Sequence, residues 1–137
     1  MTMVTFETRR LPNDPDVIAP DGSEVRLLPR LAGGSLAHFK LAPGKTSVPV
    51  AHRSVEEIWY VLGGHGEMWR QLGDRAEIVA MEPGVALTIP VGTRFQFRCL
   101  GSEALEVVAV TMPPWPGPGE ALAMPGPWEP TVAPGPG

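Results

Sequence analysis

The sequence predicts an all-β protein, either a sandwich or a barrel, and two observations lead to that class. Turn-forming pairs such as Gly33-Gly34, Pro43-Gly44 and Gly63-Gly64 recur about every ten residues from residue 23 to 112. The runs between them are short and rich in β-branched and aromatic residues, and none keeps an apolar period of 3.6 residues over three turns. Evenly spaced short strands are typical of sandwiches and barrels.

The turns divide the chain into nine expected strands. In order they are 24–28, 35–42, 46–52, 56–62, 66–71, 76–81, 85–89, 94–99 and 104–112. Strand 56–62 is apolar on both faces after its glutamates, as expected for a strand covered on each side by a second sheet or a partner subunit.

Strand 94–99 alternates between apolar and polar residues, which separates its two faces. The inward face should carry Phe95, Phe97 and Cys99. The other face should carry Arg94, Gln96 and Arg98, and we expect the two arginines, opposite the pocket, in solvent or at a dimer interface.

Length and charge exclude several classes of protein. A chain of 137 residues predicts one domain, and a net charge of −4 with scattered arginines predicts no nucleic-acid partner. The single cysteine excludes an internal disulfide. We find no apolar leader and no apolar run of membrane-spanning length, so we expect a cytoplasmic protein without a membrane partner.

Three segments are expected: an irregular arm over 1–22, a barrel over 23–112 and a Pro- and Gly-rich extension over 113–137. Proline at such density cannot join a sheet interior. Because large apolar rings gain by docking, Trp115 and Trp128 favour an extension that straps onto the domain, through Trp128, over a disordered tail.

Two glycine-framed motifs resemble those of the cupin family, small barrels with a double-stranded β-helix or jelly-roll arrangement. The first motif is matched by Gly44, Val50, His52, Glu57 and Gly64, and the second by Gly84, Pro90, Gly92, Phe95 and Cys99. The resemblance covers residues 24–111 and implies a cupin-type barrel. It also implies a homodimer, since small single-barrel cupins commonly pair.

The resemblance also implies a divalent metal held by three histidines and a glutamate, but Val50 and Phe95 stand at two of those four positions. Only His52 and Glu57 remain, fewer than the three or four protein ligands of typical catalytic centres. We therefore predict no metal site. If a metal were bound, it would need a third ligand, for which His38 is a candidate.

Without a metal, the same positions predict an apolar pocket for a small organic molecule, with His52 and Glu57 as its polar groups. The expected lining residues are Val50, Trp59, Val61, Phe95, Phe97 and Cys99. An inward glutamate needs a partner, and His52 is the nearest candidate. Such a pair suits metal-independent isomerisation, cyclisation or lyase-type proton transfer.

Two alternatives stay open. One is a metal-dependent cupin enzyme, a dioxygenase or isomerase, that recruits a third ligand. The other is a binding module without catalysis, in which the His/Glu pair is structural.

Overall fold

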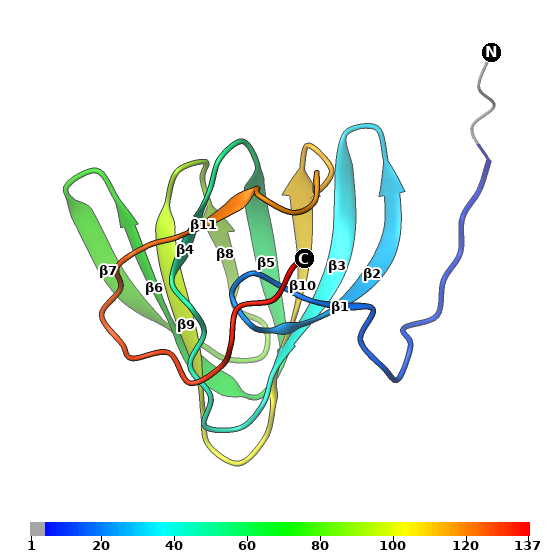
Figure 1. Ribbon diagram of the computed structural model, residues 1–137. Helices are drawn as coiled ribbons and strands as arrows, with labels where there is room; N and C mark the ends of the chain where they lie inside the picture. Colours follow the sequence, from blue (N-terminus) through cyan, green and yellow to red (C-terminus); the bar gives the residue numbers. More distant parts are fainter. Residues whose placement is uncertain (1–4) are drawn as a thin grey trace.

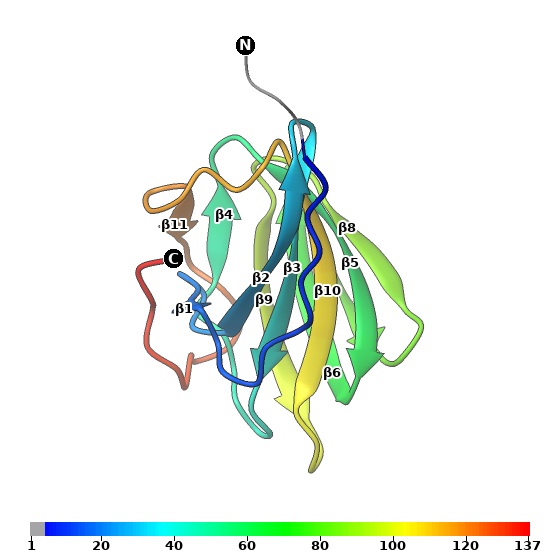
Figure 2. The ribbon, with the colours of Figure 1, turned by 90° about the vertical axis from the view of Figure 1, so that its right-hand side faces the viewer.

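The computed structural model describes residues 5–137 and consists of two antiparallel β-sheets that face each other (Figures 1 and 2). The strand order is β1-β2-β3-β10-β5-β8 in one sheet and β11-β4-β9-β6-β7 in the other. The predicted all-β jelly-roll class is confirmed. The first four residues of the expected arm, 1–4, lie outside the described part.

Eleven strands form these sheets within residues 5–137. The six-stranded sheet contains β1 (Val17–Ile18), β2 (Glu24–Leu31), β3 (Gly34–Leu41), β5 (Glu56–Gly63), β8 (Ala86–Ile89) and β10 (Leu105–Met112). The five-stranded sheet contains β4 (Val50–His52), β6 (His65–Leu72), β7 (Arg75–Met81), β9 (Arg94–Leu100) and β11 (Ala121–Ala123).

The turn between β5 and β6 shows why this framework needs glycine. Gly64 has a φ of 78°, and a Cβ on it would collide with the carbonyl oxygen of Ala104. Both the left-handed backbone and the close approach exclude a side chain. The chain can therefore pass directly from one sheet to the other.

The strand expected over 46–52 is shorter than predicted, since only Val50–His52 is regular strand. Pro49 has no N–H to donate to a ladder, and upstream of it one isolated bridge joins Thr46 to Arg98. Strands β1 and β11 were not expected, because both lie in proline-containing terminal segments.

Strand β5 places alternate residues inside and outside. Glu57, Trp59 and Val61 are buried, whereas the outward Ile58, Tyr60 and Leu62 are 45%, 47% and 50% exposed. Nothing among residues 5–137 covers this outer face, so a second subunit on it stays a prediction.

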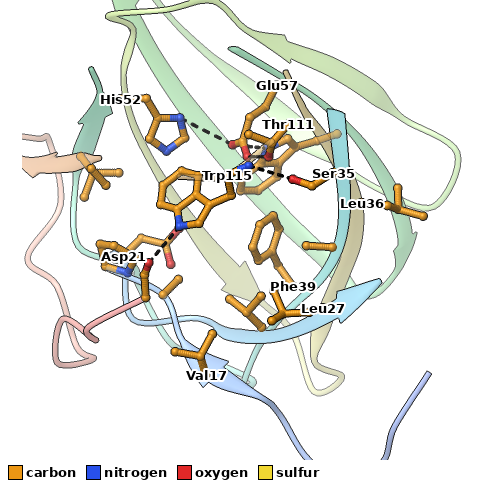
Figure 3. Close-up of a pocket in the computed structure, with 18 of the residues that line it drawn as sticks. Val17, Asp21, Leu27, Ser35, Leu36, Phe39, His52, Glu57, Thr111 and Trp115 are labelled. Carbon is orange, nitrogen blue, oxygen red and sulfur yellow. Dashed lines mark hydrogen bonds and ion pairs between the residues drawn. The ribbon is translucent and has the colours of Figure 1, made fainter. Parts of the chain in front are cut away.

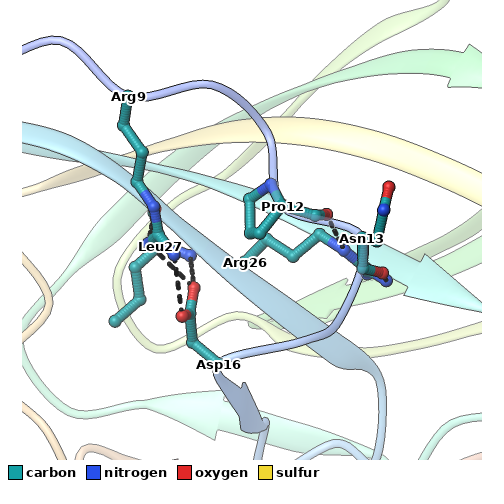
Figure 4. A network of polar contacts seen from close by, with 6 residues as sticks. All are labelled: Arg9, Pro12, Asn13, Asp16, Arg26 and Leu27. Carbon is teal, nitrogen blue, oxygen red and sulfur yellow. Dashed lines mark hydrogen bonds and ion pairs between the residues drawn. The ribbon is translucent and has the colours of Figure 1, made fainter.

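The N-terminal arm follows the outer side of β2 (Figure 4). Asp16, paired with Arg9 at 2.9 Å, accepts from the Leu27 N–H of β2 at 2.8 Å, and the buried Arg26 of β2 donates from Nε to the Pro12 carbonyl at 3.0 Å. The arm is therefore tied to the sheet at two points.

The C-terminal extension wraps the barrel, as the orange-to-red trace in Figure 1 shows. Gln96 donates from Nε2 to the Trp128 carbonyl at 2.8 Å and accepts from the Trp128 N–H at 3.1 Å. The Arg98 guanidinium lies 4.1 Å from the centre of the Trp128 ring. The C-terminal extension, residues 113–137, is thus a strap that covers Gln96 and Arg98 on the outward face of β9; the Gln96 side chain is fully buried, whereas Arg94 stays exposed.

Residues 5–137 include no helix of the length and apolarity needed to span a membrane.

Candidate functional site

A cavity of about 410 Å³ opens between the two sheets (Figure 3). Its walls come from the inner faces of β2, β3 and β5, from β4 and β9, and from both terminal segments. Most lining side chains are apolar. Five predicted lining or site residues lie on its wall: Val50, His52, Glu57, Trp59 and Phe95.

Val61, Phe97 and Cys99, also expected to line the pocket, do not reach it. All three are buried in the hydrophobic core, beside residues such as Met68 and Met81. Alternation along a strand predicts which face a residue takes but not how far along the barrel the cavity extends. Core side chains fill the interior at the level of these three residues.

Glu57 is 3% exposed, and both of its carboxyl oxygens accept hydrogen bonds. Trp59 Nε1 donates to Oε1 at 3.1 Å, and the Thr111 hydroxyl donates to Oε2. Burial raises the pKa of Glu57 to about 7, because the charged form loses water; the two hydrogen bonds offset part of that rise. Glu57 therefore changes charge near neutral pH.

His52 is 7% exposed and lies between two aromatic rings. The ring centres of Phe95 and Trp115 are 5.2 and 5.1 Å away, both edge-to-face. Burial lowers the pKa of His52 to about 4. The imidazole is therefore neutral at physiological pH.

His52 and Glu57 face each other without a hydrogen bond. His52 Nδ1 lies 3.7 Å from Glu57 Oε1, and within residues 5–137 this buried nitrogen has no hydrogen-bond partner. With a neutral imidazole the contact is not an ion pair. Glu57 is held by Trp59 and Thr111 rather than by His52, which corrects the partner expected from sequence.

Asp21 is a cavity residue that the sequence analysis missed, because its Asp21-Gly22 pair indicates a turn. It is 7% exposed, and its Oδ1 accepts from the Ser23 N–H at 2.9 Å and from the Ser23 hydroxyl at 2.6 Å. Burial raises the pKa of Asp21. No motif spacing links it to Glu57.

The strap also holds the loop that joins His52 to Glu57. The Glu120 carboxylate accepts from the N–H groups of Ser54 and Val55 at 2.7 and 2.9 Å, and from the Ser54 hydroxyl. These bonds lower the pKa of Glu120 against the opposing effect of burial. The preceding residue of this loop is tied as well, since the Arg53 N–H donates to the Glu120 carbonyl at 2.9 Å.

His38 cannot serve as a third metal ligand. It lies on the outer face of β3, where its Nε2 is 3.0 Å from Glu106 Oε1, while its neighbours Ala37 and Phe39 line the cavity. The fallback site built from His38, His52 and Glu57 is therefore wrong.

The metal centre implied by the resemblance does not fit the donor set. Val50 and Phe95, which occupy two ligand positions, are register partners on β4 and β9 and offer no lone pair. Within residues 5–137, no group of three or more His, Cys, Asp or Glu side chains is placed to hold a metal ion. Both oxygens of Glu57 also accept hydrogen bonds already.

Comparison with known proteins identifies the family. The family model described as a cupin domain matches residues 37–111, which is more than half of the chain. No curated protein sequence matches this chain.

Solved structures with similar folds include larger proteins. CapF from Staphylococcus aureus superposes with a TM-score of 0.69 at 15% identity, over 85% of this chain and 32% of that one. Oxalate decarboxylase from Bacillus subtilis gives 0.66 at 15%, over 80% and 30%. An oxalate oxidase in complex with glycolate gives 0.64 at 21%, over 77% and 58%. The chain thus spans about a third of the first two and just over half of the third, and the similarity is one of fold.

Proposed function

The chain belongs to the cupin family, and we propose that it is a member that binds a small, largely apolar organic molecule in the cavity between its sheets. One observation carries this proposal: a cavity of about 410 Å³ with aromatic walls holds a few polar groups, including a buried imidazole nitrogen that has no hydrogen-bond partner among residues 5–137. Small-molecule sites typically combine an apolar wall with few convergent polar groups.

Filling the cavity tests the proposal. We expect 4-phenylbutan-1-ol to bind by isothermal titration calorimetry, and Ala37→Phe, which places a ring on the lining of β3, to abolish that binding. The matched control is Ala80→Phe on the exposed side of β7. Circular dichroism of both variants verifies the fold. Equal binding by wild type and Ala37→Phe would contradict this location.

Glu57 supports a second function, proton transfer to or from the bound molecule. A carboxyl group with a pKa of about 7 in an apolar cavity is suited to act as both general acid and general base at neutral pH. His52 adds a neutral imidazole beside it. Isomerisation, cyclisation and lyase-type elimination all need such a step.

A minimal probe of this chemistry is the elimination of 5-nitrobenzisoxazole. The base takes the proton from C3, the electron pair forms the nitrile, and the N–O bond breaks to release a coloured phenolate. We expect the rate to rise as Glu57 ionises through pH 7, and Glu57→Gln to abolish it. Glu56→Gln, on the exposed neighbour, is the control. Turnover retained in Glu57→Gln would assign the base elsewhere.

The proposal assigns no metal to this cavity, because Asp21, His52 and Glu57 line its wall but no group of three or more His, Cys, Asp or Glu side chains within residues 5–137 is placed to hold a metal ion. Elemental analysis of protein purified without chelator tests this. A stoichiometric transition metal, lost in Glu57→Gln, would contradict it and favour a metal-dependent enzyme.

A further inference from the structure

Several hydrogen-bond donors on the cavity wall are already engaged within the protein. Both indole N–H groups there are committed, Trp59 to Glu57 and Trp115 to the Gly137 oxygen at 2.9 Å. The Thr111 hydroxyl donates to Glu57 as well. A ligand that enters meets oxygens and a nitrogen that need donors.

Three acceptor groups face the cavity from different elements. Among residues 5–137, the hydrogen bonds to the Asp21 carboxyl all go to Oδ1, which leaves Oδ2 without a donor. Each Glu57 oxygen has one donor and room for a second. His52, 93% buried and neutral, keeps one ring nitrogen as an acceptor, and its Nδ1 has no partner.

The buried charged side chains on the cavity wall are acidic. Asp21 and Glu57 are buried close enough that the Asp21 charge raises the pKa of Glu57. The only lysine or arginine on the wall, within the described part of the chain, is Arg30, and it lies in an exposed position on β2. The cavity therefore holds two buried acids and no buried cation.

Aromatic rings complete the wall on several sides. Phe39, Trp59, Phe95 and Trp115 all line the cavity, and the Trp59 ring centre lies 5.3 Å from that of Phe39 and 5.9 Å from that of Phe95. Aromatic faces attract cations, most strongly when the cation is withdrawn from water. Buried carboxylates do the same when they have no other counter-ion.

From this arrangement we infer that the ligand of the cavity is an organic cation, an ammonium group on an apolar body. The inference rests on the proposed binding function and names the class of ligand. An ammonium has three N–H donors, which would meet Asp21, Glu57 and His52, while its carbon skeleton contacts the rings. A carboxylate ligand would face Arg30 only at the opening and two acids inside.

Three probes with one skeleton test the inference: 4-phenylbutylamine, 4-phenylbutan-1-ol and 4-phenylbutyrate. Calorimetry at about pH 8 keeps the alkylamine protonated. We expect the amine to bind about tenfold more tightly than the alcohol, and the carboxylate most weakly. Asp21→Asn, which keeps the oxygen that accepts from Ser23, should reduce the ratio of amine to alcohol affinity towards one.

Asp74→Asn, in an exposed turn, is the matched control and should leave the ratio unchanged. If Asp21→Asn does not fold, Glu57→Gln takes its place with the same expected loss of preference. An alcohol that binds as tightly as the amine, or a carboxylate that binds most tightly, overturns the inference and leaves the proposed function standing. If none of the three probes binds, the proposed function and this inference both fall.

Discussion

Glu57 and His52 change protonation in opposite directions for one reason, the loss of water around each group. Burial raises the pKa of Glu57 from 4.5 to about 7 and lowers that of His52 from 6.5 to about 4. Relative to the unfolded chain, the folded protein therefore keeps a proton on Glu57 and keeps one off His52. Both side chains are neutral between about pH 4 and pH 7.

These shifts have opposite effects on stability. The contribution of Glu57 is fully present below pH 4.5 and is lost as pH rises to about 7. That of His52 is fully present above pH 6.5 and is lost as pH falls to about 4. Each contribution to the free energy of unfolding is on the order of 3 kcal/mol when fully present. Between pH 4.5 and pH 6.5 one contribution falls with pH while the other rises, so the two changes cancel.

Glu57→Gln removes the pH dependence of stability that comes from Glu57 and leaves the one that comes from His52. We expect the free energy of unfolding of this variant to rise by about 2 kcal/mol from pH 4.5 to pH 6.5, as the unfolded His52 loses its proton, whereas that of wild type stays nearly constant over the same range. Urea denaturation across that range measures it. Glu56→Gln, the exposed control, should follow wild type. A profile parallel to that of wild type would mean that burial does not raise the pKa of Glu57.

At this scale the sequence predicted the direction of side chains better than their partners. Alternation in 56–62 and 94–99 placed Glu57, Trp59 and Phe95 on the cavity side. It could not supply Thr111, more than fifty positions away, as the donor to Glu57, or Asp21 as a second acid. Those contacts depend on how the sheets and the arm come together.

The loop between β4 and β5 depends on an element far away in the sequence. Residues 53–55 have no ladder partner of their own, and Glu120 supplies the acceptors for their N–H groups. Because this loop joins His52 to Glu57, the strap fixes the spacing between the two side chains.

Glu120→Ala should loosen this loop. The substitution leaves the N–H groups of Ser54 and the fully buried Val55 without acceptors, so we expect a loss of about 2 kcal/mol in the free energy of unfolding. We also expect faster amide exchange at these two positions by NMR. Glu82→Ala, in an exposed turn, is the control. Unchanged amide exchange rates at Ser54 and Val55 would show that the loop keeps its structure without Glu120.

Elements within the barrel were predictable because turn and strand signals are local. The strands expected at 35–42, 56–62 and 104–112 all appear, with boundaries within about two residues. Strands β1 and β11 exist only because β2 and β4 offer them partners. Their own residues carry no signal that competes with the surrounding prolines.

On the scale of the whole molecule, the two terminal segments meet beside the cavity. The N–H groups of Gly135 and Gly137 donate to the carbonyls of Ala19 and Ile18 at 2.8 and 3.0 Å. Figure 1 shows the red C-terminal end of the chain close to β1, although β1 belongs to the N-terminal segment. The cavity is thus bounded by the barrel and by both extensions, and its ligand must fit all three.

Removing residues 127–137 tests whether this closure matters for binding. The truncation deletes the contacts of Trp128 with Gln96, of Thr131 with Thr46 and of Gly135 with Ala19, but keeps Trp115, Glu120 and β11. We expect the affinity for 4-phenylbutan-1-ol to fall about tenfold, mainly through faster dissociation, because Pro136 and Gly137 leave the cavity wall. Stopped-flow fluorescence and calorimetry measure both quantities.

Trp128→Ala is the matched variant: it loses the ring over Arg98 but keeps the backbone hydrogen bonds to Gln96, so its affinity should change less. A truncated protein with the melting temperature and affinity of the full chain would show that the strap does not close the cavity in solution.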